Sequence, residues 1–294
     1  MTEPGAPAAT ALEPRTDTSP AALSAAIHDD LVRSAVRRRA IAGERVVRTA
    51  ELIAYVCDLP SPEVNVVAQA RFGSDAAADR AIEEAIALFG GTPFLWWLGS
   101  ADTPADLGER LNRAGVGYLD DFPGMAMDLE DLADPADAPG PPDLDITAVL
   151  DPAAMAAFHS VLVQGFPEDF VDAGVDAAIG ESSVRIAIET DYREPNGLPT
   201  RWLGTVGGRP VTTTRLHTAA GVAGIYAVVT AADDRRRGYG EAITRHVLQV
   251  ARDHGFRIAT LQASAVGRGV YERIGFRTLR MYRLHEWQPE VRGA

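Results

Sequence analysis

The sequence predicts an α/β (α+β) protein built from two domains, each with a mixed, largely antiparallel sheet flanked by helices. Three observations support this fold class. Apolar, β-branched runs alternate with segments of helical spacing along both halves of the 294-residue chain. A segment rich in Asp, Ala and Pro separates the two halves. In the second half, a strand, a basic glycine loop and a helix follow one another directly from residue 223 onward.

The first domain is expected to span residues 21–135, after a disordered tail of residues 1–20. It begins with a helix in which Ile27, Leu31 and Ala35 recur every four residues and form an apolar face. Asp29 and Asp30 fall on the other faces of this helix. Beyond it, the pattern predicts strands at 65–72, 93–98 and 122–129 and helices at 75–88 and 104–113.

Residues 136–143 are expected to link the domains, because Pro139, Pro141 and Pro142 fix the backbone and remove hydrogen-bond donors. The second domain then spans residues 144–294. Its predicted elements are a strand at 144–149, a helix at 152–164, a possible strand at 184–188, a hairpin of 201–206 and 209–217, a strand at 225–230, a helix from 240, a strand at 257–264 and a last strand at 278–287.

The order of strand, basic glycine loop and helix after residue 225 is typical of a phosphate cradle. A helix start leaves backbone N–H groups unpaired and carries partial positive charge, so it favours an anion. A Walker loop is excluded because the chain contains no lysine. A dinucleotide fingerprint would place its third glycine at position 243, where the chain has Ile243.

The remaining pattern is R-x-x-G-x-G after a strand, and it resembles the acetyl-CoA loop of the GNAT superfamily of N-acetyltransferases. A second block lies downstream, where Val270, Tyr271, Gly275 and Phe276 match the family's L/V-Y-x-x-x-G-F. Ser264 stands where the family usually has asparagine. Residues 21–135 resemble the degenerate N-terminal copy of tandem family members, in the order of their elements more than in motifs.

The resemblance implies a binding site for acetyl-CoA as co-substrate. The loop would bind its pyrophosphate, three strand residues would pair with its pantetheine arm through the main chain, and Ser264 would bond the arm farther along. The residues so assigned are Val228, Val229, Thr230, Arg235, Arg236, Arg237, Gly238, Tyr239, Gly240 and Ser264.

Tyr271 is the residue expected to act as general acid toward the leaving thiolate, because a phenol with an ordinary pKa near ~10 is protonated at neutral pH. The alternative is a tyrosine that packs under the co-substrate without a proton role. The general base stays open among His217, Glu168 and Asp169, and the amine can also lose its proton to water. Phe166 and Phe170 are candidates for contact with the acceptor, with core packing as the alternative.

The composition of the chain restricts the kinds of partner that it can bind. The formal net charge of −13 argues against sequence-independent nucleic-acid binding, which needs a basic face. No apolar run is long enough to span a membrane and no export signal is present, so a cytoplasmic protein is expected. The single Cys57 excludes an intrachain disulfide and is expected in the core, and the histidine spacing implies no metal.

These observations predict an acetyl-CoA-dependent N-acetyltransferase that acts on a primary amine of a small molecule or a protein. The rival hypothesis is a non-catalytic acyl-CoA-binding or interaction module with the same fold. Cofactor binding without thiol release would distinguish it. The acceptor and the oligomeric state stay open.

Overall fold

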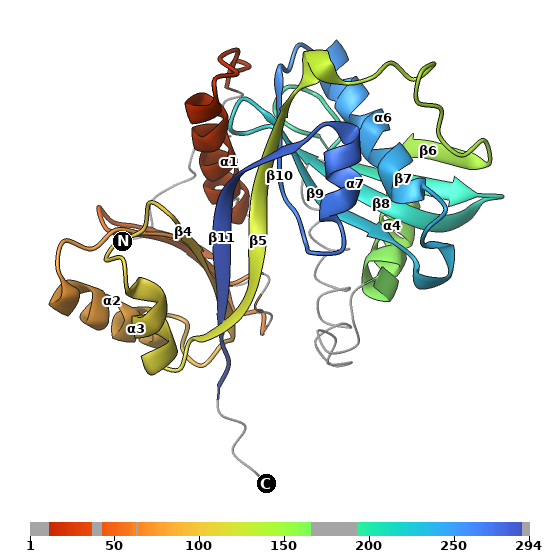
Figure 1. Cartoon of the computed structure of the whole chain (residues 1–294). Helices are drawn as coiled ribbons and strands as arrows, with labels where there is room; N and C mark the ends of the chain where they lie inside the picture. The colour runs from red at the N-terminus through yellow and green to blue at the C-terminus, as the bar shows by residue number, and fades with distance from the viewer. Residues whose placement is uncertain (1–11, 37–42, 61, 63, 166–192, 290–294) are drawn as a thin grey trace, which may run out of the picture.

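The computed structural model describes residues 12–36, 43–60, 62, 64–165 and 193–289, and within these residues eleven strands form one continuous sheet (Figure 1). The strand order is β1-β2-β3-β4-β11-β5-β10-β9-β8-β7-β6. The strands are β1 Arg45–Arg48, β2 Leu52–Val56, β3 Val66–Ala70, β4 Phe94–Gly99, β5 Gly117–Asp128, β6 Leu144–Ala148, β7 Arg201–Val206, β8 Arg209–His217, β9 Ala223–Thr230, β10 Ile258–Gln262 and β11 Arg277–Trp287. The α-helices among these residues are α1 Pro20–Ala35, α2 Asp75–Leu88, α3 Leu107–Arg113, α4 Pro152–Gly165, α6 Tyr239–Asp253 and α7 Arg268–Ile274. The mixed α/β class is confirmed, and the sheets of the two halves are joined.

The two halves exchange their last strands. β5, from the first half, pairs antiparallel with β10, whereas β11, from the end of the chain, pairs antiparallel with β4. β5 and β11 also pair with each other along most of their lengths and lie side by side at the centre of the molecule (Figure 1). Each half therefore has its sheet completed by a strand from the other.

Helices cover both faces of the sheet. Neighbouring residues Ala126 and Met127 of β5 pack against α1 and against the core beneath α6, so these two helices lie on opposite faces. α4 shares the face of α1 and packs through Phe158 against Leu203 of β7. α2 and α3 pack on the face opposite α1 in the first half, over the fully buried Trp96.

Helices and strands with a clear local sequence signal occur where the sequence predicts them. α2 spans the predicted 75–88, and the side chain of Ser74 caps its first turn. The hairpin of β7 and β8 turns at Gly207 and Gly208, both of which have positive φ. The helix expected from Pro104 begins at Leu107 instead, and β1 is a strand that the pattern did not predict. The expected strand at 184–188 lies outside the described residues.

The burial of α1 extends beyond its apolar face. Asp29 is half-exposed and pairs with Arg15, but Asp30 has no exposed surface, although both lie off the face of Ile27 and Leu31. Nearly the whole circumference of α1 is covered, because it lies across β5, β10, β11 and β3 at the junction of the two halves. Because α1 is buried, a charged side chain on it is costly unless it is paired or hydrogen-bonded.

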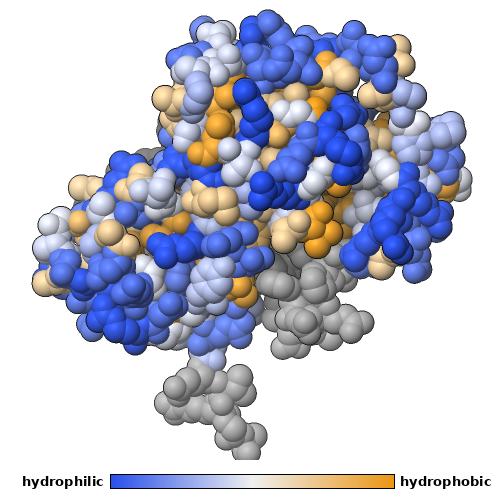
Figure 2. All heavy atoms as spheres, viewed as in Figure 1, coloured by the Kyte–Doolittle hydropathy of each residue, from blue (hydrophilic) through white to orange (hydrophobic). Residues whose placement is uncertain are grey.

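Polar side chains dominate one face of the molecule (Figure 2). Figure 2 shows charged and polar residues over most of the face in view, with apolar residues in small groups between them.

Cys57 is buried, as expected. Among the described residues, no helix has the length and apolar character to cross a bilayer, and no group of three or more His, Cys, Asp or Glu is arranged to hold a metal ion.

Candidate active site

The candidate site begins where two neighbouring strands separate. β9 and β10 run parallel, but they pair only at Ala223 with Ala259 and at Gly224 with Thr260. β9 continues to Thr230 without a further ladder partner on that side among the described residues. The edge of β9 beyond Gly224 is therefore open to an extended ligand, which can add to it like another strand.

A bulge changes the direction of β9 at the open edge. Thr213 and Arg215 of β8 pair with Val229 and Tyr226 of β9. One residue lies between the first two, whereas two residues lie between the second two, so β9 has one extra residue here. Within this bulge Ala227 takes a left-handed φ of 50°. A bulge re-aims the backbone and leaves part of the ladder unpaired. The N–H and C=O groups of the neighbouring residues are thus turned out of the regular ladder at the middle of the open edge.

Buried threonines of β8 hold the bulge in place. The Thr213 hydroxyl donates to the carbonyl of Ala227 at 3.0 Å, and the Thr212 hydroxyl donates to that of Val229 at 2.9 Å. Both threonines are fully buried. Carbonyls that lost ladder partners are therefore satisfied by side chains, which avoids the cost of leaving them buried and unpaired.

The basic loop leads from the end of β9 into α6 as predicted. Gly238 has a φ of 84°, Arg236 a φ of 63°, and no side chain of the described residues caps the first turn of the helix. A Cβ added at Gly240 would lie 3.2 Å from Oγ1 of Thr230, so the helix start and the strand end are in close contact. The first-turn N–H groups of α6 are therefore left for an anion beside the open edge of β9.

The three arginines of the loop have different surroundings, although all are exposed. Arg235 donates from Nε to the Thr230 carbonyl at 3.2 Å and so braces the loop. Arg237 lies 3.7 Å from the buried carboxylate of Asp234, which Arg209 also holds at 2.6 Å. Arg236 has no ion pair with any described residue, which makes it the arginine most available to a phosphate.

Tyr239 takes a structural position. Its side chain is buried, and its hydroxyl donates to Asp143 of the linker at 2.9 Å. Only its backbone N–H is left to face a ligand. The bond fixes the linker to the start of α6.

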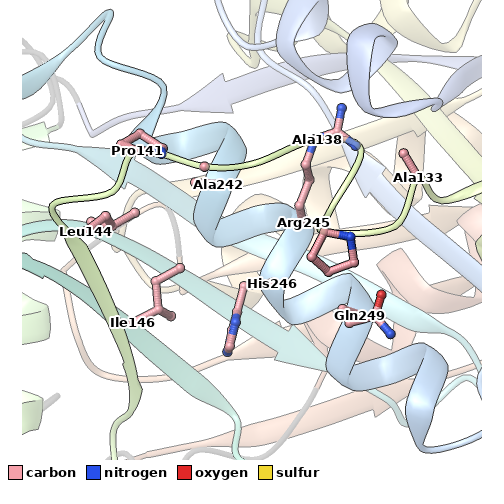
Figure 3. A pocket seen from close by; sticks show the side chains of 11 residues that line it. Ala133, Ala138, Pro141, Leu144, Ile146, Ala242, Arg245, His246 and Gln249 are labelled. Carbon is pink, nitrogen blue, oxygen red and sulfur yellow. The ribbon is translucent and has the colours of Figure 1, made fainter.

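A cavity of about 270 Å³ lies between the linker and α6, lined among others by Pro141, Leu144, Arg245 and His246 (Figure 3). The residues that line it include none of those predicted for the site. It is a space beside the helix, distinct from the split between β9 and β10.

Ser264 and Tyr271 come together on the far side of the split. A Cβ at Gly267 would lie 3.1 Å from the Tyr271 ring and 3.3 Å from Oγ of Ser264, so only glycine fits this position without displacing its neighbours. Ser264 Oγ accepts from the Gly267 N–H at 3.2 Å. Tyr271 and Val228 pack against the same core beneath α6.

The Tyr271 phenol is suited to hold a proton. Burial raises its pKa to about 12, and its ring meets Phe276 edge-on at 6.0 Å. Its hydroxyl has no hydrogen-bond partner among the described residues. Its role as general acid stays a prediction.

The candidate bases fall in two places. Glu168 and Asp169, like Phe166 and Phe170, lie outside the described residues. His217 is fully buried at the end of β8, on the face covered by α1, with its Nδ1 3.2 Å from Asp30. No sequence pattern indicates this partner, because it lies 187 residues earlier in the chain.

The first half contains a similar split, but it is filled. β3 and β4 pair in parallel only at Val66 with Leu95 and at Val67 with Trp96. Beyond these pairs the carboxylate of Asp102 accepts from the N–H groups of Ala70 at 3.0 Å and Gly99 at 2.7 Å. A side chain thus occupies the open strand edges that a ligand would need.

The helix after this split also lacks an anion site. Ser74 Oγ accepts from the N–H of Ala77 at 3.2 Å, so a side chain already satisfies one of the first-turn N–H groups of α2. This cap makes that N–H unavailable to a phosphate. Only the second half therefore presents an open split next to an uncapped helix start within the described residues.

The sequence of the second half matches a known family. Residues 163–276 match the model of the acetyltransferase (GNAT) family. The match includes β9, the basic loop, α6, β10 and α7. No curated protein matches the chain by sequence.

Solved structures resemble the whole chain. A GCN5-related N-acetyltransferase from Kribbella flavida is 20% identical, with a TM-score of 0.62, covering 95% of this chain and 98% of its own. One from Sphaerobacter thermophilus is 17% identical, with a TM-score of 0.56 and coverage of 91% and 93%. A tandem GNAT protein from the clavulanic acid biosynthesis pathway is 11% identical, with a TM-score of 0.53 and coverage of 96% and 99%. At these identities the likeness establishes the fold.

Proposed function

We propose that this chain, whose residues 163–276 belong to the acetyltransferase (GNAT) family, is an acetyl-CoA-dependent N-acetyltransferase that moves acetyl directly from the thioester to a primary amine. The observation that carries the proposal is the open, bulged edge of β9 next to the uncapped start of α6. The acceptor is a small molecule or a protein, and the reaction takes place in the cytoplasm, where the thioester is available. Nucleic acids and membranes are not among the proposed partners.

Acetyl-CoA would lie across the split. The N–H groups of residues 238–240 and the side chains of Arg235, Arg236 and Arg237 would bind its pyrophosphate. The main chain of Val228, Val229 and Thr230 would pair with the pantetheine arm, and Ser264 would meet that arm from the β10 side. The exposure of the loop and the open edge of β9 support these roles.

Two protein groups would then act on the reacting atoms. A backbone N–H at the bulge around Ala227 would polarise the thioester carbonyl, since a fixed donor in a partly buried site stabilises developing negative charge. Tyr271 would protonate the leaving thiolate, which its raised pKa permits because the phenol keeps its proton until the thiolate forms.

The proposal also assigns a role to each half of the chain. Residues 144–294 form the catalytic GNAT domain, and residues 21–135 form a degenerate GNAT-like copy without a co-substrate site. The filled split at Asp102 and the Ser74 cap at the start of α2 support this assignment. Because β5 and β11 are exchanged, neither segment contains its complete sheet.

The proposal predicts one acetyl-CoA site per chain, despite the duplicated architecture. Calorimetric titration of acetyl-CoA into the intact protein should give a stoichiometry near one. Two sites per chain would contradict the interpretation that Asp102 and the Ser74 cap close the first half.

Arg236→Ala should weaken acetyl-CoA binding about tenfold, because a charge-assisted hydrogen bond to phosphate is worth about 1.5–3 kcal/mol and this arginine is exposed. The matched control is Arg48→Ala on the edge strand β1, which removes an exposed arginine far along the sheet. Equal affinity in both variants would remove Arg236 from the site.

The test of function is thiol release from acetyl-CoA over a broad panel of amines. Release that depends on an amine, with an equal amount of acetylated amine, supports the enzyme. Binding with a stoichiometry of one and no release over the panel supports the rival, a non-catalytic acyl-CoA-binding module.

A further inference from the structure

A buried aspartate of α1 joins three strands of the second half. Oδ2 of Asp30 accepts from the hydroxyls of Tyr226 at 2.7 Å and Thr260 at 2.8 Å, and Oδ1 lies 3.2 Å from Nδ1 of His217. These partners lie on β9, β10 and β8. A carboxylate without exposed surface is costly unless it is bonded in this way.

This carboxylate lies at the foot of the split. Gly224 is the last residue of β9 that pairs with β10, and a Cβ added to it would lie 2.3 Å from Oδ2 of Asp30. The glycine thus leaves room on β9 for a side chain from another part of the chain. Asp30 lies directly beside the point at which the strands separate.

The contact between Nδ1 and Asp30 orients the His217 imidazole, and its other nitrogen, Nε2, is not used in that contact. The imidazole has no exposed surface, and its Nε2 has no hydrogen-bond partner within the described part of the chain. A carboxylate at Nδ1 favours the tautomer with the proton on Nδ1, which leaves the lone pair on Nε2. A buried, unpaired nitrogen of this kind needs a proton-bearing partner such as a water or an amine.

We propose that Asp30 of α1 positions His217 as the general base that takes the proton from the acceptor amine, directly or through one water. Asp30 lies outside the family-matched residues 163–276 and acts only through His217, so it is a positioning residue. This inference rests on the proposed function and deepens it, because it supplies the base that the acyl transfer needs.

The protons and bonds balance. His217 Nε2 takes one proton from the ammonium, and the free amine attacks the carbonyl carbon. As the C–N bond forms and the C–S bond breaks, Tyr271 gives its proton to the thiolate and regains one from the attacking nitrogen. The proton on His217 then passes to solvent, and the imidazolium is stabilised by the Asp30 carboxylate until it does.

The groups around the pair leave His217 as the proton acceptor. Tyr226 on β9 keeps its proton, because burial and the Asp30 charge raise its pKa well above the ordinary range. Tyr282 on β11 also has a raised pKa, first through burial. Arg215 on β8 faces Tyr226, and Thr260 on β10 and Ser34 on α1 are hydroxyl groups that do not titrate.

The test compares Asp30→Asn and His217→Gln with the matched control Asp29→Asn, which removes the neighbouring, half-exposed carboxylate. An asparagine can donate to Nδ1 and so move the imidazole proton to Nε2, which removes the base. We expect kcat/KM for the amine to fall about a hundredfold at neutral pH in both test variants. The deficit should shrink as pH rises and the amine loses its proton unaided. The control should keep the parent profile.

Calorimetric affinity for acetyl-CoA separates this role from a structural one. We expect it to be unchanged in both variants, because the pair does not contact the proposed loop site. An unaltered pH profile, or an equal loss at every pH together with lost acetyl-CoA affinity, would overturn the inference. If one variant does not fold, the other decides. A parent that binds acetyl-CoA but never releases thiol would instead refute the proposed function itself.

Discussion

Tyr271→Phe should lower kcat by about a hundredfold while acetyl-CoA affinity stays within about twofold of the parent. The ring packs against Gly267 and Phe276, and phenylalanine keeps these contacts. Only the hydroxyl is lost, and with it the proton for the leaving thiolate, a contribution of general acids that is commonly 10²–10⁴-fold. Rapid-quench or continuous thiol detection at saturating amine measures kcat, and calorimetry measures the affinity.

The pH dependence of the parent gives an independent check of this role. Because burial raises the pKa of Tyr271 to about 12, the phenol stays protonated throughout the neutral range. The acid should therefore cause no alkaline fall in kcat until pH approaches 12. Tyr118→Phe, at an exposed tyrosine of β5, is the matched control and should leave kcat unchanged. Unchanged kcat in Tyr271→Phe, with thiolate release rate-limiting, would show that the tyrosine only packs.

Gly240→Val should raise the Kd for acetyl-CoA at least about a hundredfold. A Cβ at this position already lies 3.2 Å from Oγ1 of Thr230, and the further methyl groups would fill the space between the helix start and the strand end. Loss of the phosphate contacts at the first turn of α6 would cost about 3 kcal/mol, which is about a hundredfold in Kd. Calorimetric titration beside the parent measures the difference.

The chain offers a matched glycine for this experiment. Gly73 precedes α2 in the first half, and a Cβ added there meets nothing within 4 Å. Gly73→Val should therefore bind acetyl-CoA like the parent. If Gly240→Val binds equally well while remaining folded by circular dichroism, the pyrophosphate does not lie at the start of α6.

Elements with local signals could be predicted from the sequence. α2 has its apolar face and its Ser74 cap within one short segment, and the β7–β8 hairpin carries its turn glycines between its strands. The loop at Arg235–Gly240 could be recognised because an anion cradle needs a strand, glycines and a helix start in direct succession. These residues are neighbours in sequence, so a linear pattern contains them.

Features that depend on distant partners could not be predicted. The exchange of β5 and β11 depends on which edges the strands meet, and the apolar alternation of a strand does not identify its neighbour. The burial of Asp30 could not be predicted for the same reason: a helical pattern separates apolar from polar positions, but it does not reveal hydroxyl and imidazole partners on three strands. Asp102 closes its split with backbone N–H groups, which leave no trace in the sequence.

Through these distant contacts, the first half of the chain contributes to the structure of the second half. Its own split is filled, yet its helix α1 lies across the central strands and its strand β5 stands between β11 and β10. The degenerate copy would thus support the catalytic half by completing its sheet and by supplying Asp30. Loss of the first half would remove both.

A crystal structure of the intact chain with acetyl-CoA tests the central claim most directly. The account predicts electron density for one molecule, with the pyrophosphate against residues 235–240, the pantetheine along β9 from Val228 to Thr230, and the thioester between the bulge at Ala227 and the Tyr271 hydroxyl. Density in the cavity between the linker and α6, or in the split between β3 and β4, would contradict it.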